Sequence, residues 1–368
     1  MAAQRTKNRC RVAVVGAGIN GVMTAWALRK RGCEVVVFER GEAMRETSSA
    51  STKLLHGGLR YLENGEFRLV REALAERAWW LAQAPHLCRP IEIILPIRTG
   101  IGRSRWKIGL GLRIYDLLAG QRGIRPHRWL DREATLAAIP GLRKEGLRGS
   151  FSFWDGQMDD LALGCWAAEQ ARSAGVLLRE RCDVQAVAAD GSVRTAAGTE
   201  TFDLVVNVAG PWAGELLARS GIPSSYRLDL VRGSHLVTSR PCERGILSEV
   251  AGERRIGFVL PWKEGTLIGT TEVRQVDPNG ARCSAEEERY IRAFHDSVLE
   301  DPLRDDELLG SFAGIRPLIS SSADPGRATR EYAIERRGSL VTVFGGKWTT
   351  ARALGERVAR EADRLNGG

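Results

Sequence analysis

The apolar positions near the start of the chain form two short uninterrupted runs, separated by a longer mixed segment. Residues 11–15 (RVAVV) and 34–38 (EVVVF) are apolar runs of the length that is typical of strands buried in a parallel sheet. Residues 22–31 between them have a helix-like pattern. The order predicts a strand, a helix and a second parallel strand.

Three glycines occupy the predicted turn between the first strand and the helix, in the spacing Gly16-x-Gly18-x-x-Gly21. Gly16 permits a tight turn, Gly18 removes a side chain that would block a pyrophosphate, and Gly21 lets the helix and the strand pack closely. Glu39 ends the second strand and can accept hydrogen bonds from a ribose diol, which argues against a 2′-phosphate there. Together these features predict a dinucleotide site.

Two later segments repeat the strand-then-glycine arrangement. Residues 203–210 end in Ala209-Gly210, and residues 341–346 end in Gly345-Gly346. Three such turns far apart in the chain imply one long ligand held by a discontinuous domain. Residues 47–63 add hydroxyls, a histidine and an arginine where a flavin would extend, so the pattern favours FAD over NAD.

The stretches between the nucleotide-binding turns predict a second layer over the flavin. Residues 234–238, 256–260 and 266–270 read as strands of an antiparallel sheet, and residues 285–298 read as a helix. The fold class is therefore α/β, a Rossmann-like FAD-binding domain with a parallel sheet and a substrate domain on an antiparallel sheet. The expected FAD-binding domain comprises residues 1–90, 150–225 and 305–368, and the expected substrate domain comprises residues 91–149 and 226–304.

Composition narrows the class of protein. The chain has 368 residues and 43% hydrophobic content, enough for a substantial core, and it has no apolar run long enough to span a bilayer. The N-terminal residues lack the apolar core of a signal peptide, so a cytoplasmic location is expected. Seven scattered cysteines without a CxxC pair and five histidines without metal-ligand spacing predict no disulfide framework and no metal.

Most of the net charge of +9 comes from the segment between Arg98 and Arg148, which contains twelve Lys or Arg residues and four acidic residues. Residues 103–118 predict a helix with apolar positions at 108, 112, 115 and 118 and Trp106 at one end. Either this helix packs its apolar face on the protein, or it makes a peripheral contact with a membrane surface. No nucleic-acid-binding motif accompanies the basic residues, so nucleic acid is not an expected partner.

Eight separated blocks resemble the FAD-dependent glycerol-3-phosphate dehydrogenases, members of the D-amino-acid oxidase and glycine oxidase fold group. The resemblance runs from about residue 10 to about residue 355. It implies FAD, oxidation of the secondary alcohol of sn-glycerol 3-phosphate or a related anionic hydroxy compound to the ketone, and electron transfer to quinone or another acceptor. The matching blocks are residues 16–21, 48–63, 67–77, 207–212, 232–235, 268–272, 314–317 and 345–350.

The chain departs from the family pattern in three places. It ends after one predicted helix, residues 350–365, where the family continues into a C-terminal helical domain. Glu272 stands where the family usually has aspartate, and Trp348 stands where a smaller aliphatic residue is usual. These differences leave the exact substrate and any homo-oligomer open.

Oxidising an alcohol requires a base, a group that favours the developing alkoxide and anchors for the rest of the substrate. His235 is the expected base, and the resemblance gives Arg316 the role of orienting the hydroxyl or ketone. His56 is a second candidate base, with a competing role in fixing the flavin-facing loop. Further substrate contacts are expected from Arg60, Tyr61 and Lys347 around a phosphate, and from Thr271. Arg60 has a competing role in a salt bridge to Glu63 or Glu66, and Lys347 a competing role beside the reduced flavin.

The residues expected to bind FAD follow the fingerprint and the matched blocks. They are Gly16, Gly18, Ile19, Asn20, Gly21, Glu39, Arg40, Thr47, Ser48, Ser49, Lys53, Leu54, His56, Gly57, Val184, Ala209, Gly210, Trp212, Gly314, Arg316, Gly346, Lys347, Trp348 and Thr349. Two other functions stay open: an oxidase that acts on an amine or hydroxy acid with oxygen as acceptor, and a partner-dependent flavoprotein electron carrier. Peroxide production would identify the former, and activity only with an added partner protein would identify the latter.

Overall fold

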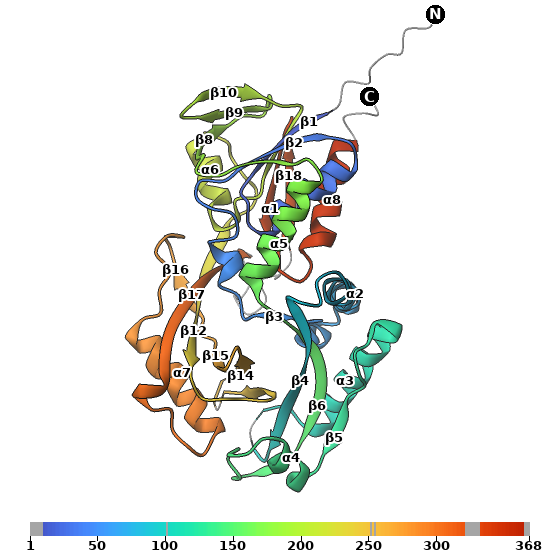
Figure 1. Ribbon diagram of the computed structural model, residues 1–368, viewed down its shortest axis with the longest axis vertical. Coiled ribbons are helices and arrows are strands. Elements are labelled where there is room, and N and C mark those ends of the chain that lie inside the picture. The colour runs from blue at the N-terminus through green and yellow to red at the C-terminus, as the bar shows by residue number, and fades with distance from the viewer. Residues whose placement is uncertain (1–9, 101, 251, 254, 321–331, 364–368) are drawn as a thin grey trace, which may run out of the picture.

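A six-stranded sheet forms one end of the molecule (Figure 1). The computed structural model describes residues 10–363 except 101, 251, 254 and 321–331. The strand order in this sheet is β18-β19-β11-β1-β2-β7, and all neighbours are parallel except β18 and β19. The strands are β1 (Arg11–Val15), β2 (Glu34–Phe38), β7 (Leu177–Arg179), β11 (Leu204–Asn207), β18 (Tyr332–Arg337) and β19 (Leu340–Gly345). The predicted strands at 11–15 and 34–38 are confirmed as β1 and β2.

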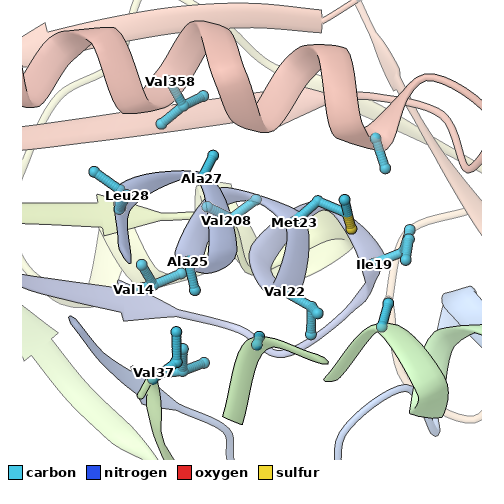
Figure 2. Close-up of a cluster of buried hydrophobic side chains, with 14 of the residues drawn as sticks. Val14, Ile19, Val22, Met23, Ala25, Ala27, Leu28, Val37, Val208 and Val358 are labelled. Atoms are coloured by element: carbon cyan, nitrogen blue, oxygen red, sulfur yellow. The ribbon is translucent and has the colours of Figure 1, made fainter. Parts of the chain in front are cut away.

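Helix α1 (Ile19–Lys30) lies in the centre of the largest apolar core. Figure 2 shows Val358 of α8 (Ala351–Asp363) on one side of α1 and Val14 and Val37 of the sheet on the other. A Cβ at Gly355 would lie 2.7 Å from the Met23 backbone, so this glycine lets α8 approach α1 closely. The predicted C-terminal helix is therefore present, although its expected end at Leu365 lies outside the described residues.

A ten-stranded sheet with the order β16-β12-β15-β14-β13-β4-β6-β3 forms the other end, with β17 paired to β12 and β5 paired to β6. Its pairs are antiparallel apart from β13 and β4. The predicted strands at 234–238 and 256–260 lie in β12 and β14, and the one at 266–270 matches β15 except for its last residue. The bounds are β3 (Leu54–Leu55), β4 (Cys88–Arg98), β5 (Arg128–Leu130), β6 (Leu147–Met158), β12 (Leu228–Thr238), β13 (Gly245–Glu249), β14 (Ile256–Trp262), β15 (Gly265–Gly269), β16 (Val273–Gln275) and β17 (Leu308–Ile319).

Three strands from the segments expected to form the FAD-binding domain belong to the ten-stranded sheet. β3, β6 and β17 fall wholly or mainly within those segments, yet β3 pairs with β6, β6 with β4, and β17 with β12. An apolar strand pattern shows that a segment is buried, but it does not show which sheet provides its hydrogen-bond partners.

The remaining helices cover the two sheets. The bounds are α2 (Phe67–Gln83), α3 (Arg105–Ala119), α4 (Arg132–Ala138), α5 (Asp160–Ser173), α6 (Ala213–Arg219) and α7 (Ala285–Val298). A three-stranded meander of β8 (Val184–Val187), β9 (Ser192–Thr195) and β10 (Gly198–Thr201) lies beside the parallel sheet (Figure 1). Within the described part of the chain, every helix is too short or too polar to cross a membrane.

Candidate active site

A cavity of about 890 Å³ is lined by residues of both large sheets. Its lining includes the turn between β1 and α1, the end of β2, the turn after β11, strands β12 and β17, and the turn after β19. These include the three strand-then-glycine turns that the sequence singled out. The fold therefore brings distant segments together around one cavity.

The glycines of the first turn have the geometric roles that the spacing predicts. Gly16 has φ +104°, and a Cβ there would lie 2.8 Å from the Val208 carbonyl oxygen. A Cβ at Gly21 would lie 1.9 Å from the Gly16 carbonyl oxygen, so Gly21 serves helix packing and lies outside the cavity lining. Gly18 lines the cavity, where the Ile19 amide donates to Ser48 Oγ over 2.9 Å. The N-terminus of α1 thus faces the cavity, as a pyrophosphate site requires.

Glu39 is buried at the end of β2 and lines the same cavity. Its carboxylate accepts hydrogen bonds from the backbone amides of Ala17 and Gly41, at 2.8 and 2.9 Å. These bonds fix the side chain beside the glycine turn, and a carboxylate retains lone pairs for a ribose diol. The position fits the dinucleotide role inferred from the sequence.

Trp212 contacts residues of both parts of the fold beside the cavity. The Arg40 guanidinium lies 3.9 Å from the centroid of the Trp212 ring, and both residues line the cavity. Trp212 Nε1 donates to Asn279 Oδ1, 3.0 Å away, in the segment after β16. Trp212 therefore joins the turn after β11 to the segment that follows β16.

His235 lies on β12 and lines the cavity although its side chain is buried. Its ring stacks on Phe312, with centroids 4.8 Å apart, and Nε2 is 3.4 Å from Thr52 Oγ1. Among the described residues, Nδ1 has no hydrogen-bond partner. Burial lowers the pKa of His235 well below 6.5, and the charges of Arg316 and Lys53 lower it further. A neutral imidazole has one ring nitrogen with a lone pair, which a proton acceptor requires.

Arg316 reaches across β12 toward the same part of the cavity. It lies opposite Val231 in the register of β12 and β17, and a Cβ at Gly233 would lie 2.4 Å from its guanidinium. Arg316 Nη1 donates to the Thr271 carbonyl oxygen over 3.2 Å, and Nη2 donates to Thr270 Oγ1 over 2.9 Å. Gly233, which sequence reasoning did not assign to the site, therefore makes room for this guanidinium.

Thr271 was expected to contact substrate, but it lies outside the cavity lining. Its buried hydroxyl accepts from the Ser234 amide at 2.9 Å and donates to Glu287 Oε1 at 2.6 Å. Ser234 Oγ also donates to Glu287, which forms an ion pair with Arg232. Burial raises the pKa of Glu287, but hydrogen bonds, above all from Thr271, outweigh burial and lower it to about 2. These hydrogen bonds hold Thr271 in place, and its carbonyl oxygen accepts a hydrogen bond from Arg316.

Glu287 was not identified from the sequence as part of this network. A signal for its position was present, because Ser284-x-x-Glu287 is a capping box at the start of α7. That pattern predicts a helix start, but it does not show that the carboxylate also reaches Thr271 and Ser234 on the sheet.

Four other predicted residues lie outside the lining. Lys53 is buried, with Nζ 2.5 Å from Asp160 Oδ1 and 2.7 Å from the Ser49 carbonyl oxygen. The Ser49 hydroxyl donates to nearby backbone carbonyls, and the Gly57 amide donates to the Tyr115 hydroxyl over 2.8 Å. Arg60 is exposed. Lys53, Ser49 and Gly57 hold residues 47–57 in place around the cavity, a role that their spacing did not indicate.

Of the three residues predicted to bind a phosphate, Tyr61 and Lys347 line the cavity and Arg60 does not. Lys347 Nζ lies 4.0 Å from the centroid of the Tyr61 ring. Glu63, one of the two expected partners of Arg60, pairs with Arg103. The other predicted lining residues are Ile19, Asn20, Thr47, Ser48, Leu54, His56, Val184, Ala209, Gly210, Gly314, Gly346, Trp348 and Thr349.

The polar groups that line the cavity fit FAD. The α1 N-terminus and Glu39 line it, and so do His235, Arg316 and Lys347. Buried Asn20 Oδ1 has no hydrogen-bond partner within the described chain, and Asn20 lines the cavity at the glycine turn. No cluster of three or more His, Cys, Asp or Glu residues suited to a metal ion occurs in the described ranges.

Comparisons with known proteins agree with this site. The family model described as "FAD dependent oxidoreductase" (DAO) matches residues 11–361. Glycerol-3-phosphate dehydrogenase of Pseudomonas aeruginosa is 37% identical over 94% of this chain and 70% of its own length. D-erythritol 1-phosphate dehydrogenase of Brucella abortus is 34% identical over 95% of this chain and 72% of its own length.

Among solved structures, glycerol-3-phosphate dehydrogenase from Bacillus halodurans complexed with FAD superposes with a TM-score of 0.78 and 26% identity. The match covers 98% of this chain and 66% of that chain, so the present chain is about two thirds as long as the relative. These comparisons confirm the resemblance read from the sequence, the α/β fold class and FAD as the cofactor. The chain belongs to the DAO family of FAD-dependent oxidoreductases and is a relative of the glycerol-3-phosphate dehydrogenases.

Proposed function

We propose that this oxidoreductase oxidises the secondary alcohol of sn-glycerol 3-phosphate, or of a closely related polyol phosphate, to the ketone. The observation that carries the proposal is the buried His235 beside Arg316 in the FAD cavity. Two relatives more than 30% identical over most of the chain are named for dehydrogenation of glycerol 3-phosphate and of D-erythritol 1-phosphate. Both names denote dehydrogenases of polyol phosphates.

The cavity side chains have separate roles in the proposed reaction. FAD, when bound, supplies the hydride acceptor. His235 takes the hydroxyl proton because its depressed pKa keeps the imidazole neutral at working pH. Arg316 donates hydrogen bonds to the substrate oxygen as negative charge develops on it, and Lys347 with Tyr61 binds the phosphate.

Anaerobic loss of the visible absorbance of bound flavin tests the substrate class. Glycerol 3-phosphate or D-erythritol 1-phosphate should bleach the purified holoprotein rapidly, whereas unphosphorylated glycerol, lactate and glycine should not. Bleaching by lactate or glycine, with peroxide formed once oxygen is admitted, would favour an oxidase instead. Re-oxidation by a soluble quinone analogue then tests quinone, the electron acceptor that the family resemblance implies.

We expect Lys347→Met to raise KM for glycerol 3-phosphate about 10- to 100-fold, since a hydrogen bond to a charged group contributes about 1.5–3 kcal/mol. Arg60→Ala should change KM less, because Arg60 lies outside the cavity lining. Steady-state kinetics of both variants provide the measurement. A larger effect from Arg60→Ala would show that the arginine moves onto the phosphate when substrate binds.

We also propose that α3 contacts an anionic membrane surface, where a lipid-soluble electron acceptor would be reached. The apolar face predicted from the sequence packs inward, because Leu112 and Tyr115 are buried. A second stripe of Trp106, Leu110 and Leu117 is 82%, 61% and 80% exposed. These residues share one face of the helix through their i, i+4, i+11 spacing.

Basic side chains surround this second stripe. Arg105, Lys107 and Arg113 of α3 are exposed, and so are Arg122 and Arg125 just beyond it. Exposed aromatic and aliphatic side chains bordered by cations are typical of helices that lie in a membrane interface. Each cation near an anionic surface contributes roughly 1 kcal/mol.

Changing Trp106, Leu110 and Leu117 together to serine should reduce co-sedimentation of the holoprotein with vesicles that contain anionic lipid. Val276→Ser is the matched control, because Val276 is 97% exposed but lies away from α3. Binding should also weaken as salt is raised. Equal binding by the triple variant and the control would disprove the contact.

A further inference from the structure

Five tryptophans form a continuous set of ring contacts that begins at the FAD cavity. Trp348 lines the cavity, and its ring centroid is 5.1 Å from that of Trp80. Trp80 is 4.8 Å from Trp79 and 6.4 Å from Trp166. Trp26 is 6.3 Å from both Trp79 and Trp166, so two routes lead from Trp80 to Trp26.

The burial of these rings changes along the set. Trp80 is fully buried, whereas Trp79, Trp166 and Trp26 are half-buried where α1, α2 and α5 meet. Lys30 Nζ lies 4.0 Å from the centroid of the Trp26 ring, and the Arg352 guanidinium lies 5.0 Å from that of the Trp79 ring. Trp26 is the ring separated from Trp348 by the most ring contacts. The set therefore connects the cavity with the protein surface through one fully enclosed ring.

Hydrogen bonds also distinguish the inner rings from the outer ones. Trp348 Nε1 donates to the Ser48 carbonyl oxygen at 3.0 Å, and buried Trp80 Nε1 donates to the Thr349 carbonyl oxygen at 3.1 Å. Their indole protons are thus held inside the protein. At Trp26, the nearby ammonium disfavours a second positive charge, so an oxidised indole there would lose its proton to water.

We propose that these five tryptophans form a path for light-driven one-electron transfer from the protein surface to the FAD cavity. Indole is among the side chains that are most easily oxidised, but a ground-state flavin is too weak an oxidant to remove its electron, so light is required. The proposal rests on FAD as the cofactor and is independent of the substrate.

Electrons and protons balance along the path. When FAD is bound and excited by light, Trp348 would give one electron to the flavin, which would keep it, and Trp80 would then give one to oxidised Trp348. Trp79 or Trp166 re-reduces Trp80, and Trp26 supplies the last electron and releases its indole proton to water. A thiol in solution returns a hydrogen atom to Trp26, and two of the resulting thiyl radicals combine to a disulfide.

Transient absorption and flavin fluorescence of the FAD-loaded protein test this path. The wild type should show weak flavin fluorescence and a long-lived tryptophan radical after a light pulse. Trp348→Phe should restore fluorescence and abolish the radical, because the first donor is lost. Trp80→Phe should leave fluorescence weak but remove most of the long-lived radical, because the charge then recombines before it reaches the surface.

Matched variants test whether these five rings, and not other aromatic side chains, carry the electron. Trp129→Phe, outside this set, should leave both signals unchanged. The proposal is overturned if Trp80→Phe keeps the wild-type radical lifetime, or if fluorescence recovers in Trp212→Phe or Tyr61→Phe instead of Trp348→Phe. If Trp80→Phe does not fold, flavin fluorescence of Trp348→Phe still tests whether Trp348 is the first electron donor. A colourless protein would instead contradict FAD binding itself, so the two failures are distinguishable.

Discussion

Replacing His235 with asparagine should lower kcat for glycerol 3-phosphate by about two to four orders of magnitude, the usual contribution of a general base. The imidazole is buried against Phe312, and its Nδ1 has no hydrogen-bond partner within the described chain. FAD should stay bound, because His235 lies on β12 of the ten-stranded sheet, whereas the glycine turn and Glu39 adjoin the six-stranded sheet. Flavin absorbance and steady-state kinetics measure the two properties separately.

The pH dependence gives a second test of this role. Because burial, Arg316 and Lys53 depress the pKa of His235 below 6.5, kcat/KM should stay level as pH falls to 6.5 and decline only at lower pH. That acidic decline should disappear in His235→Asn. His56→Asn is the matched control, since His56 lines the same cavity. A larger loss of kcat in His56→Asn than in His235→Asn would make His56 the base.

Gly18→Glu should abolish FAD binding. A Cβ at Gly18 already lies 3.0 Å from Ser48 Oγ, and a carboxylate there would occupy the space in front of the α1 N-terminus. The negative charge would also repel a pyrophosphate held at that helix end. The purified variant should be colourless and should not turn yellow on addition of FAD.

Gly214→Glu on α6 controls for the added side chain, because a Cβ there meets no heavy atom within 4 Å. Circular dichroism of both variants shows whether the fold is kept. A folded Gly18→Glu protein with a full complement of flavin would refute the pyrophosphate position.

The cofactor-binding half of the site could be predicted because its signals are local. The apolar runs at β1 and β2, the glycines between them and Glu39 each depend on a few neighbouring residues. Strand burial and turn geometry are largely fixed by such short segments. The predicted antiparallel strands and the α7 helix were confirmed for the same reason.

The hydrogen bonds that hold Thr271 beside Arg316 could not be predicted from local patterns. Thr271 was read as a substrate contact, yet the structure turns its hydroxyl to Glu287 and leaves only its carbonyl oxygen to Arg316. A threonine in a strand pattern does not show what lies behind the sheet. That choice depends on where α7 packs.

The sequence by itself determined the FAD fold, the family and most of the cavity-lining residues, because these depend on short patterns that recur in order. The tertiary structure decided which charges are free to act: Lys53 is held by Asp160, 107 positions away. It also decided which face of α3 is exposed and brought Trp348 to Ser48 across 300 positions. Contacts between residues so far apart are set by how the two sheets and their helices pack, and no local pattern encodes them.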